Sequence, residues 1–342
     1  MKKKLHIHVM HYRQEQLIYQ ATKEQLGDAL ARHADVADLV TITVSAVEKY
    51  KPVDWTKDDL ENYLRLASGA DVLYGYTFLT EGVSDYAPDL KWMQSASSGV
   101  EQLMPFDWIP DGVTLTNSRG IHQERSGESF AMYLGMLGMQ IPKLFTQQCK
   151  GEWKAARATA LAGRTLVLIG VGSQGGEMAR QAKKFGMKVV GMDPFVREHP
   201  CCDEIAPFEK MREAFGRADF LALCAPLTKQ TYKIVDEEQL GWLPDGAGVI
   251  NVARGPLMDE GALSRALHAG KLSGAVLDVF DVTPLPYDSP LWTTPNLFIS
   301  PHVSSDDPIH YSPLCLDILM RNVKNYFAGR PFENVVDTKK EF

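Results

Sequence analysis

The stretch that decides the fold is TLVLI at residues 165–169, followed by GVGSQG at residues 170–175. The first five residues form a continuous apolar run, which is typical of a parallel strand buried on both faces. A predicted helix follows the glycines, because apolar side chains recur on one helical face at Met178, Ala182 and Phe185. A strand, a glycine turn and a helix in this order predict a doubly wound α/β domain.

The three glycines of this turn have separate uses in a dinucleotide-binding loop. Gly170 allows the tight turn, Gly172 lets the backbone approach a pyrophosphate, and Gly175 lets the helix pack closely on the strand. The free N–H groups at the start of the helix suit phosphate oxygens. The plainer alternative is a glycine-rich turn in another doubly wound protein, so the residues that follow decide the ligand.

An acidic residue follows the second strand of this domain. Residues 188–192 read as that strand, and Asp193 comes directly after it. The carboxylate can accept hydrogen bonds from both ribose hydroxyls and would repel a 2′-phosphate. The sequence therefore predicts NAD(H) as the cofactor, with NADP less favoured, although Arg197 nearby weakens that preference.

Composition limits the class of protein. The 342 residues suffice for two domains, and 45% hydrophobic residues are normal for a globular protein. A net charge of −7 without a basic stripe argues against nucleic acid as a partner. No apolar run is long enough to span a membrane, and residues 1–8 lack the features of a signal peptide. We therefore expect no membrane partner. Five irregularly spaced cysteines do not indicate a disulfide framework, and this favours a cytoplasmic protein.

Two blocks of alternating strand and helix signals predict two α/β domains. Residues 1–118 together with 306–342 are expected to form a smaller, flavodoxin-like parallel substrate-binding domain, and residues 119–305 an NAD-binding Rossmann domain. The predicted strands are 5–10, 36–44, 70–74, 91–95 and 113–116 in the first block, and 165–169, 188–192, 219–224, 248–252, 275–277 and 296–300 in the second. The predicted helices that flank them include 15–32, 57–67 and 314–327.

Residues 124–140 predict a helix that is apolar on nearly every side. Such a helix is normally buried. We expect a second subunit to cover it in a homodimer, and the alternative is an interdomain helix in a monomer. His122 precedes this helix near the predicted domain junction and is a weaker candidate for the site.

Three side chains of complementary chemistry follow predicted strands of the second block. Arg254, Asp278 and His302 come after its fourth, fifth and sixth strands, where open α/β sheets bind ligands. A guanidinium can anchor a carboxylate and polarise a carbonyl. A histidine, which ordinarily titrates near pH ~6.5, can exchange a proton with a substrate oxygen. A carboxylate can orient a nicotinamide through its carboxamide. The plainer alternatives are a surface salt bridge for the arginine and a structural role for the histidine.

In their order along the chain these motifs resemble those of the D-isomer-specific 2-hydroxyacid dehydrogenases. The motifs are the 170–175 loop with Asp193, CAPLT at 224–228, NVARG at 251–255, LDVF at 277–280 and SPH at 300–302, with LKW at 90–92, SGV at 98–100, Asn117 and Gly120 in the first block. The resemblance covers most of the chain. It implies a two-domain fold with a cleft active site, NAD(H), and a homodimer built through the dinucleotide domains. It also implies that backbone amides of residues 98–100 hold the substrate carboxylate.

One position departs from the pattern of that family. The family reads DVFExEPLP where residues 278–286 read DVFDVTPLP, so Thr283 replaces the glutamate that pairs with the catalytic histidine. Because a hydroxyl supplies no negative charge, we expect His302 to be harder to protonate than in relatives, and reduction to favour lower pH. The alternatives are that Thr283 orients the ring by a hydrogen bond, or that the charge comes from Asp281, Asp306 or Asp307.

The remaining candidates complete the expected site. Cofactor contacts are expected from Gly170, Gly172, Gln174, Gly175, Asp193, Ala225, Pro226, Thr231, Val252, Ala253 and Asp278. Substrate contacts are expected from Ser98, Gly99, Val100, Arg254 and Tyr76, and the catalytic residues are expected to be Arg254, His302 and Thr283. No metal site is expected, because His6 and His8, which alternate along one strand, are more typical of an exposed strand face.

The leading hypothesis is an NAD(H)-dependent D-2-hydroxyacid dehydrogenase or 2-oxoacid reductase that acts on a small 2-oxo or 2-hydroxy acid. One alternative is an NADH-binding sensor or transcriptional scaffold with weak or lost catalysis, which the missing glutamate favours and the retained Arg254 and His302 oppose. Another is an enzyme that takes hydride from a donor as formate dehydrogenases do. Those enzymes place glutamine beside the histidine, whereas this chain has Thr283.

Overall fold

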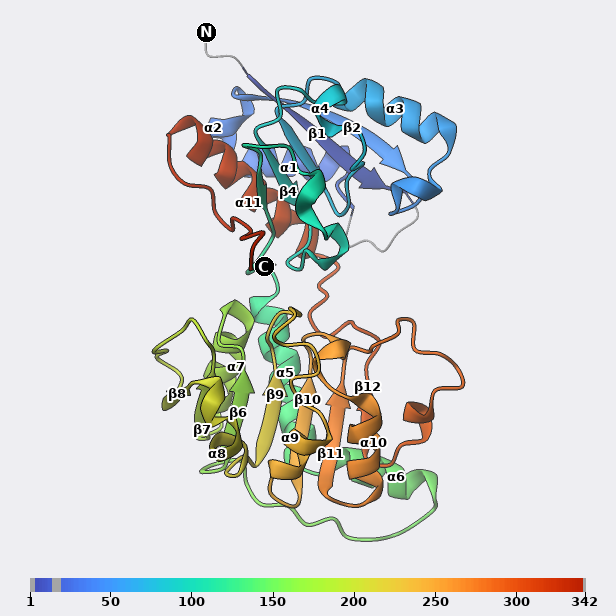
Figure 1. The fold of residues 1–342 in the computed structure, drawn as a ribbon, viewed down its shortest axis with the longest axis vertical. Helices are drawn as coiled ribbons and strands as arrows, with labels where there is room; N and C mark the ends of the chain where they lie inside the picture. Colours follow the sequence, from blue (N-terminus) through green and yellow to red (C-terminus); the bar gives the residue numbers. More distant parts are fainter. Residues whose placement is uncertain (1–3, 14–19, 341–342) are drawn as a thin grey trace. The chain divides into compact units, whose positions relative to one another are not determined.

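The computed structural model describes residues 4–13 and 20–340. The chain forms two compact units, of which the first comprises residues 1–121 and 306–342 and the second residues 122–305 (Figure 1). Both units are built on parallel sheets, as the sequence predicts. Among the described residues, no helix has both the length and the apolar character needed to cross a membrane.

The first unit contains a five-stranded sheet in the order β2-β1-β3-β4-β5. Every strand pair is parallel, and this order is that of flavodoxin-like folds, which confirms the prediction. The strands are β1 (Leu5–Tyr12), β2 (Val40–Val47), β3 (Val72–Gly75), β4 (Trp92–Ser95) and β5 (Thr114–Thr116). The helices are α1 (Lys23–Arg32), α2 (Ala34–Ala37), α3 (Lys57–Ala67), α4 (Val83–Tyr86) and α11 (Tyr311–Phe327).

The two faces of this sheet have separate hydrophobic cores. Alternate residues of β1 divide between them, since Leu5, Ile7 and Val9 belong to one core and Met10 and Tyr12 to the other. The first core also contains side chains of α1 and α11. The second contains Tyr63 and Ala67 of α3. A helix from the end of the chain therefore completes a core begun by its first strand.

The second unit contains a seven-stranded parallel sheet in the order β12-β11-β10-β9-β6-β7-β8. The strands are β6 (Thr165–Ile169), β7 (Lys188–Met192), β8 (Glu204–Ala206), β9 (Phe220–Leu223), β10 (Ala247–Asn251), β11 (Leu272–Leu277) and β12 (Leu297–Ile299). The helices are α5 (Gln123–Gly138), α6 (Ile141–Cys149), α7 (Ser173–Lys184), α8 (Met211–Phe215), α9 (Glu237–Trp242) and α10 (Glu260–His268). The strand order reverses between β6 and β9, and ligands of open α/β sheets bind at such a point.

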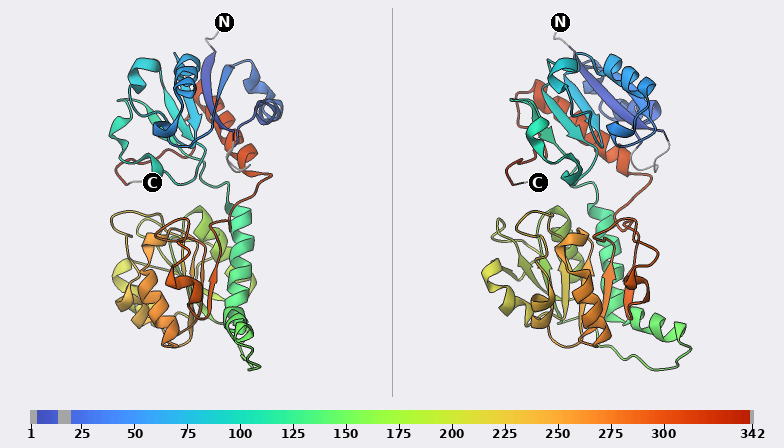
Figure 2. Two further views of the ribbon diagram at one scale, coloured as in Figure 1. Left: turned by 90° about the vertical axis from the view of Figure 1, so that its right-hand side faces the viewer. Right: turned by 45° about the vertical axis from the view of Figure 1, so that its right-hand side comes forward.

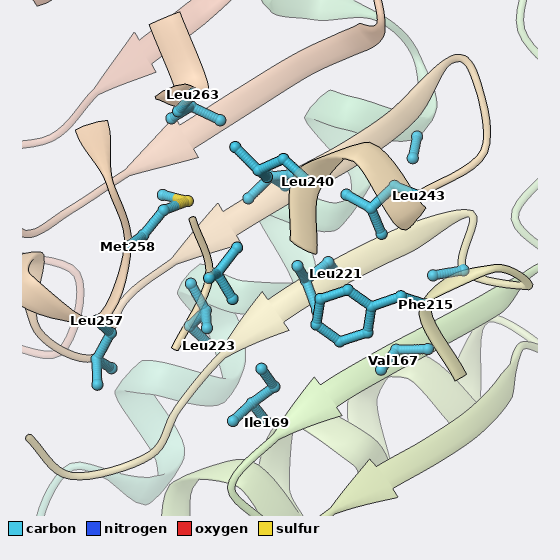
Figure 3. Close-up of a cluster of buried hydrophobic side chains, with 14 of the residues drawn as sticks. Val167, Ile169, Phe215, Leu221, Leu223, Leu240, Leu243, Leu257, Met258 and Leu263 are labelled. Atoms are coloured by element: carbon cyan, nitrogen blue, oxygen red, sulfur yellow. The ribbon is translucent and has the colours of Figure 1, made fainter. Parts of the chain in front are cut away.

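Helices cover both faces of this second sheet. On one face, buried leucines and valines of β6, β9 and β10 pack against side chains of α8, α9 and α10 in a single core (Figure 3). On the other face, Phe130, Leu134 and Leu137 of α5 join Met178 and Ala182 of α7 in a second core. Figure 2 shows α5 running along this sheet. Both faces are buried, which explains why the central strands read as continuous apolar runs.

Several predicted elements need correction. Residues 36–39 are not strand, because Val36 lies in α2 and β2 begins only at Val40. Residues 15–19 of the predicted helix 15–32 lie outside the described residues, and residues 20–22 are not helical. Thr22 instead caps α1 in a reciprocal capping box with Gln25, which fixes the helix start at Lys23. The short strand β8 was not predicted.

The histidines of β1 also differ from expectation. His8 is buried, with 1% of its surface exposed, and does not lie on an open strand face. Its Nδ1 lies 2.9 Å from Oγ1 of Thr43, its Nε2 lies 3.0 Å from Oγ of Ser45, and Nε2 of His6 lies 2.8 Å from the same Thr43 oxygen. These bonds form a polar network on the side of β1 that faces α3. Tyr63 of α3 packs edge-on against the His8 ring, with the ring centroids 4.9 Å apart.

Candidate active site

The glycine loop between β6 and α7 lies at the carboxyl end of β6, beside the point where the strand order reverses. Gly170 has a φ of 89°, and a Cβ on it would lie 2.7 Å from the backbone nitrogen of Ala225. A Cβ on Gly175 would lie 2.0 Å from the carbonyl oxygen of Gly170. Side chains are therefore excluded at both positions, as the dinucleotide fingerprint requires.

The space beside Gly172 is different. A Cβ on Gly172 would meet no atom within 4 Å, although the residue directly precedes the first turn of α7. The 12-residue helix α7 begins there without a side-chain cap, so no hydroxyl or carboxylate of Gly172 competes for its first amides. An open approach to a helix N-terminus is the cradle that a pyrophosphate needs, and the residues present fit a dinucleotide.

Asp193, at the end of β7, is tied to this loop. Its Oδ2 accepts a hydrogen bond from the backbone of Val171 at 3.0 Å. Its Oδ1 accepts from Phe195 at 2.9 Å and from Val196 at 3.0 Å. A carboxylate has about four acceptor positions, so capacity remains for a ribose hydroxyl. Arg197, the residue that would soften the preference for NAD, is exposed.

The turn after β9 is shaped by one of the expected cofactor residues. Thr231 donates its hydroxyl to the carbonyl of Pro226 at 2.7 Å and accepts from the backbone of Thr228 at 2.8 Å. Thr231 is buried in this turn, and its two hydrogen bonds hold the loop in shape. Nearby, the Gln174 side-chain oxygen lies 4.0 Å from Sγ of Cys224. The cofactor contacts expected from Gln174, Ala225, Pro226 and Thr231 stay predictions.

Arg254 follows β10 at a turn that the neighbouring asparagine fixes. Asn251 donates from Nδ2 to the Arg254 carbonyl at 2.9 Å and accepts at Oδ1 from the backbone of Ala253 at 3.1 Å. Nη1 of Arg254 donates to the carbonyl of Ala253 at 2.7 Å. A Cβ on Gly255 would lie 2.0 Å from the backbone of Phe280, so the chain can pass there only as glycine.

Asp278 anchors the loop that carries His302. The side chain is fully buried at the end of β11, with 0% exposed. Its Oδ1 accepts from the hydroxyl of Ser300 at 2.6 Å and from the backbone of Val303 at 3.2 Å, and Oδ2 accepts from the Ser304 hydroxyl. Donors from this loop thus surround the carboxylate. The expected contact with a nicotinamide carboxamide stays a prediction, and holding the loop is the role that these bonds support.

His302 itself is exposed and has an unusual backbone conformation. Its φ is 56°, in the left-handed region that residues other than glycine rarely adopt. Such outliers persist only where the surroundings hold them, and they cluster at functional sites. An exposed imidazole can exchange protons with solvent.

The structure adds His122, which precedes α5, to this neighbourhood. Its Nδ1 lies 3.0 Å from the carbonyl oxygen of Ser305. Burial lowers the pKa of His122, and the positive charges of Arg254 and His302 lower it further, while the bond to Ser305 raises it. Three basic side chains from distant parts of the sequence therefore lie within electrostatic reach of one another. In the sequence, only its position near the predicted domain junction indicated that His122 could lie here.

The expected substrate loop belongs to the first unit. Ser98 donates its hydroxyl to the carbonyl of Ser118 at 3.0 Å, and Asn117 donates from Nδ2 to the carbonyl of Ser98 at 2.8 Å. Nε2 of Gln102 lies 3.4 Å from the Gly99 carbonyl and 3.3 Å from the Tyr76 carbonyl. Side-chain hydrogen bonds thus fix the shape of the loop, and the substrate contacts expected from Ser98, Gly99, Val100 and Tyr76 stay predictions.

Thr283 lies exposed in the loop after β11. Of the carboxylates that were alternatives for the missing charge, Asp307 lies with Oδ2 2.8 Å from Nδ1 of His310, and this contact holds the pKa of Asp307 below its usual range. Burial raises the pKa of Asp281. Its backbone N–H donates to the side chain of Glu260 at 2.7 Å. The role of Thr283 stays a prediction.

Comparison with known proteins bears on the whole arrangement. A family model described as "D-isomer specific 2-hydroxyacid dehydrogenase, NAD binding domain" matches residues 131–304, which is half of the chain. The chain belongs to this family. Its members are NAD(P)-dependent oxidoreductases that act on the CH–OH group of 2-hydroxy acids. The resemblance inferred from the motifs is thereby confirmed, and the second unit contains the NAD-binding domain.

Individual relatives differ in name and length. The chain is 32% identical over 287 residues to the D-3-phosphoglycerate dehydrogenase of Methanocaldococcus jannaschii, a match that covers 82% of this chain and 54% of the relative. It is 32% identical over 232 residues to the glyoxylate reductase of Korarchaeum cryptofilum, covering 65% and 69% respectively. The chain thus spans about half the length of the phosphoglycerate dehydrogenase. A D-isomer specific 2-hydroxyacid dehydrogenase of Xanthobacter autotrophicus Py2, solved with NADPH and MES, shares the fold at a TM-score of 0.79 and 23% identity, covering 98% of this chain and 99% of that one.

Proposed function

We propose that the chain is an NAD(H)-dependent 2-oxoacid reductase, or in reverse a D-2-hydroxyacid dehydrogenase. One observation carries the proposal, namely that Arg254 and His302 lie in one electrostatic neighbourhood beyond the ends of β10 and β12. The strand between them, β11, supplies the Asp278 that holds the His302 loop. The substrate is a small 2-oxo acid, a class that includes the glyoxylate and the hydroxypyruvate for which two of the relatives are named.

The residues of the chain divide the work of the reaction. Arg254 binds the carboxylate of the 2-oxo acid and polarises its carbonyl, because a guanidinium keeps its charge and presents paired donors. His302, as imidazolium, gives its proton to the carbonyl oxygen and recovers one from solvent, to which it is exposed. Bound NADH supplies the hydride for the carbonyl carbon. The backbone amides of residues 98–100 add donors for the substrate carboxylate.

The proposed cofactor is NAD(H), held by the second unit. The open approach at Gly172 admits the pyrophosphate, and the remaining acceptor capacity of Asp193 takes the ribose hydroxyls. A 2′-phosphate would face a carboxylate already surrounded by the backbone of residues 193–196. NADP binding is disfavoured by that negative charge.

We also propose a homodimer formed through α5 and the segment after it. Apolar side chains exposed there include Met132, Met139, Leu144, Phe145 and Trp153. An apolar surface of this kind is typical of a subunit interface. Sedimentation of the protein at micromolar concentration tests this, since a monomer at all concentrations would contradict the assignment.

The function is tested by NADH oxidation with a panel of 2-oxo acids at acidic and neutral pH. The panel contains glyoxylate, hydroxypyruvate, pyruvate, and branched and aromatic acids. His302→Asn should lower kcat by about 10²–10⁴-fold, as expected on loss of a general acid, while NADH fluorescence titrations show unchanged binding. His268→Asn, an exposed histidine of α10, is the matched control and should behave like wild type. NADH binding without turnover of any acid would instead indicate a sensor of the dinucleotide.

A further inference from the structure

The loop that carries His302 is fixed at both of its ends. Ser300, at its start, donates to Asp278 of β11 at 2.6 Å. At its end, Ser129 of α5 donates its hydroxyl to the carbonyl of Ser304, and the His122 ring contacts the carbonyl of Ser305. The left-handed backbone of His302 lies between these contacts. A non-glycine residue keeps that conformation only where its neighbours hold it.

The bond from His122 has a defined direction. A backbone carbonyl can only accept, so Nδ1 of His122 carries the proton that it donates to Ser305. In the neutral ring Nε2 is then an acceptor. The ring is neutral near pH 7, because burial and the charges of Arg254 and His302 lower its pKa. Its tautomer therefore follows from the Ser305 contact.

This bond also has a special place in the chain. His122 and Ser305 are the first and last residues of the second unit. The bond thus joins the residue at which the chain enters this unit to the residue at which it leaves. The second of these, Ser305, comes three residues after His302. Loss of the bond would free the Ser305 carbonyl, while Asp278 and Ser129 would still hold Ser304 next to it.

We infer that His122 is a positioning residue for the reaction, which sets the place of the His302 imidazole through its Nδ1–H bond to the Ser305 carbonyl. The inference rests on the proposed function of His302. It assigns no proton transfer to His122 itself. It differs from a purely structural role because the bond ends within the segment that directs the proton donor, and a displacement of about 1 Å in such a group is enough to lower kcat.

Two amide variants separate this role from others. In His122→Asn the side-chain NH₂ takes approximately the place of Nδ1 and can restore the bond, whereas in His122→Gln it takes the place of Nε2 and cannot. His122→Ala removes the donor altogether. We expect kcat to fall by about tenfold to a hundredfold in the Ala and Gln variants and to return to near wild type in the Asn variant. KM and the NADH dissociation constant should change little, because the inference assigns His122 no contact with either ligand.

Three results would overturn the inference. Wild-type kcat in His122→Ala would show that the bond does not position His302. An Asn variant as slow as the Gln variant would show that the ring, and not the Nδ1–H donor, is what the reaction needs. His268→Asn serves as the matched histidine control. A parallel fall in thermal stability across all three variants, with an unchanged kcat per folded molecule, would also refute the positioning role.

A second readout does not depend on turnover. Imidazole ¹⁵N spectra of the full chain without substrate should show His122 as the Nδ1–H tautomer, with signals assigned by the His122 and His302 variants. The His302 signals should shift in the Ala and Gln variants and recover in the Asn variant. If no 2-oxo acid is reduced, the proposed function fails, yet these spectra still decide the positioning. An Nε2–H tautomer for His122 would overturn it.

Discussion

Lowering the pH from 6.5 to 5 should destabilise the first unit by about 2 kcal/mol through one side chain, His8. The hydroxyl of Thr43 donates its single proton to the carbonyl of Leu66 at 3.0 Å. It must therefore accept from both His6 and His8, which fixes Nδ1 of His8 as protonated. Nε2 of the neutral ring then accepts from Ser45. The ring is satisfied without a charge, in a site where a charge is costly.

The magnitude follows from the pKa. Burial first, and the charge of His6 second, lower the pKa of His8 from 6.5 to about 3. Between these values the unfolded chain binds a proton that the folded chain refuses, so stability rises with pH across this window. The contribution is complete above pH 6.5 and is lost progressively as the pH falls toward 3. Each pH unit within the window is worth about 1.4 kcal/mol, which gives the 2 kcal/mol between pH 6.5 and 5.

The assay compares unfolding at several pH values in wild type and a His8→Gln variant. Hydrogen exchange measured on peptides of β1 reports the first unit separately from the second. Carboxylates that lose ion pairs at low pH act equally in both proteins, so the difference between the two curves isolates His8. His268→Asn should keep the wild-type slope. A wild-type and a His8→Gln curve that stay parallel from pH 6.5 to 5 would refute the reasoning.

Three further outcomes are expected. Asp278→Ala leaves buried N–H groups of the His302 loop without acceptors, so urea unfolding should show a loss of about 2–5 kcal/mol, and a loss below about 1 kcal/mol would contradict the anchoring role. Asp193→Ser should raise KM for NADH and lower KM for NADPH by about tenfold, since it removes a negative charge from the ribose side, and an unchanged preference in steady-state kinetics would count against the NAD assignment. Thr283→Glu should extend reductase activity to higher pH by about one unit, because a nearby anion favours the protonated His302, and identical pH–rate profiles would contradict the proposed effect of this position.

Strands buried on both faces were the easiest elements to predict. The predicted limits 165–169 and 188–192 coincide with β6 and β7, because a parallel strand between two helical layers leaves an uninterrupted apolar signal. The helix 57–67 was also predicted without error. The short edge strand β8 escaped, since two of its three residues are only partly buried and Glu204 is charged. The start of α1 could have been found from the Thr22–Gln25 capping box, a signal that apolar periodicity does not include.

The residues of the candidate site also differ in how far the sequence could predict them. Residues that act through the backbone or through a strand end, such as Gly170, Gly175 and Arg254, can be located from local motifs. Contacts between distant segments cannot, because nothing local marks them. His122 and Ser305 are separated by 183 residues, and the hydroxyl of Ser129 reaches Ser304 across 175. The burial of His8 was missed for the same reason, since its partners come from β2 and not from its own strand.

Because α11 follows the second unit in the sequence, it is synthesised after that unit, which has a consequence for folding on the ribosome. One core of the first unit needs Leu316, Leu319 and Val323 beside Ile7 and Val9. Residues 1–121 therefore emerge with an apolar sheet face that α1 covers only in part while the whole second unit is made. The second unit is continuous in sequence and can fold first. Truncation before α11 should thus produce aggregation and not a stable fragment.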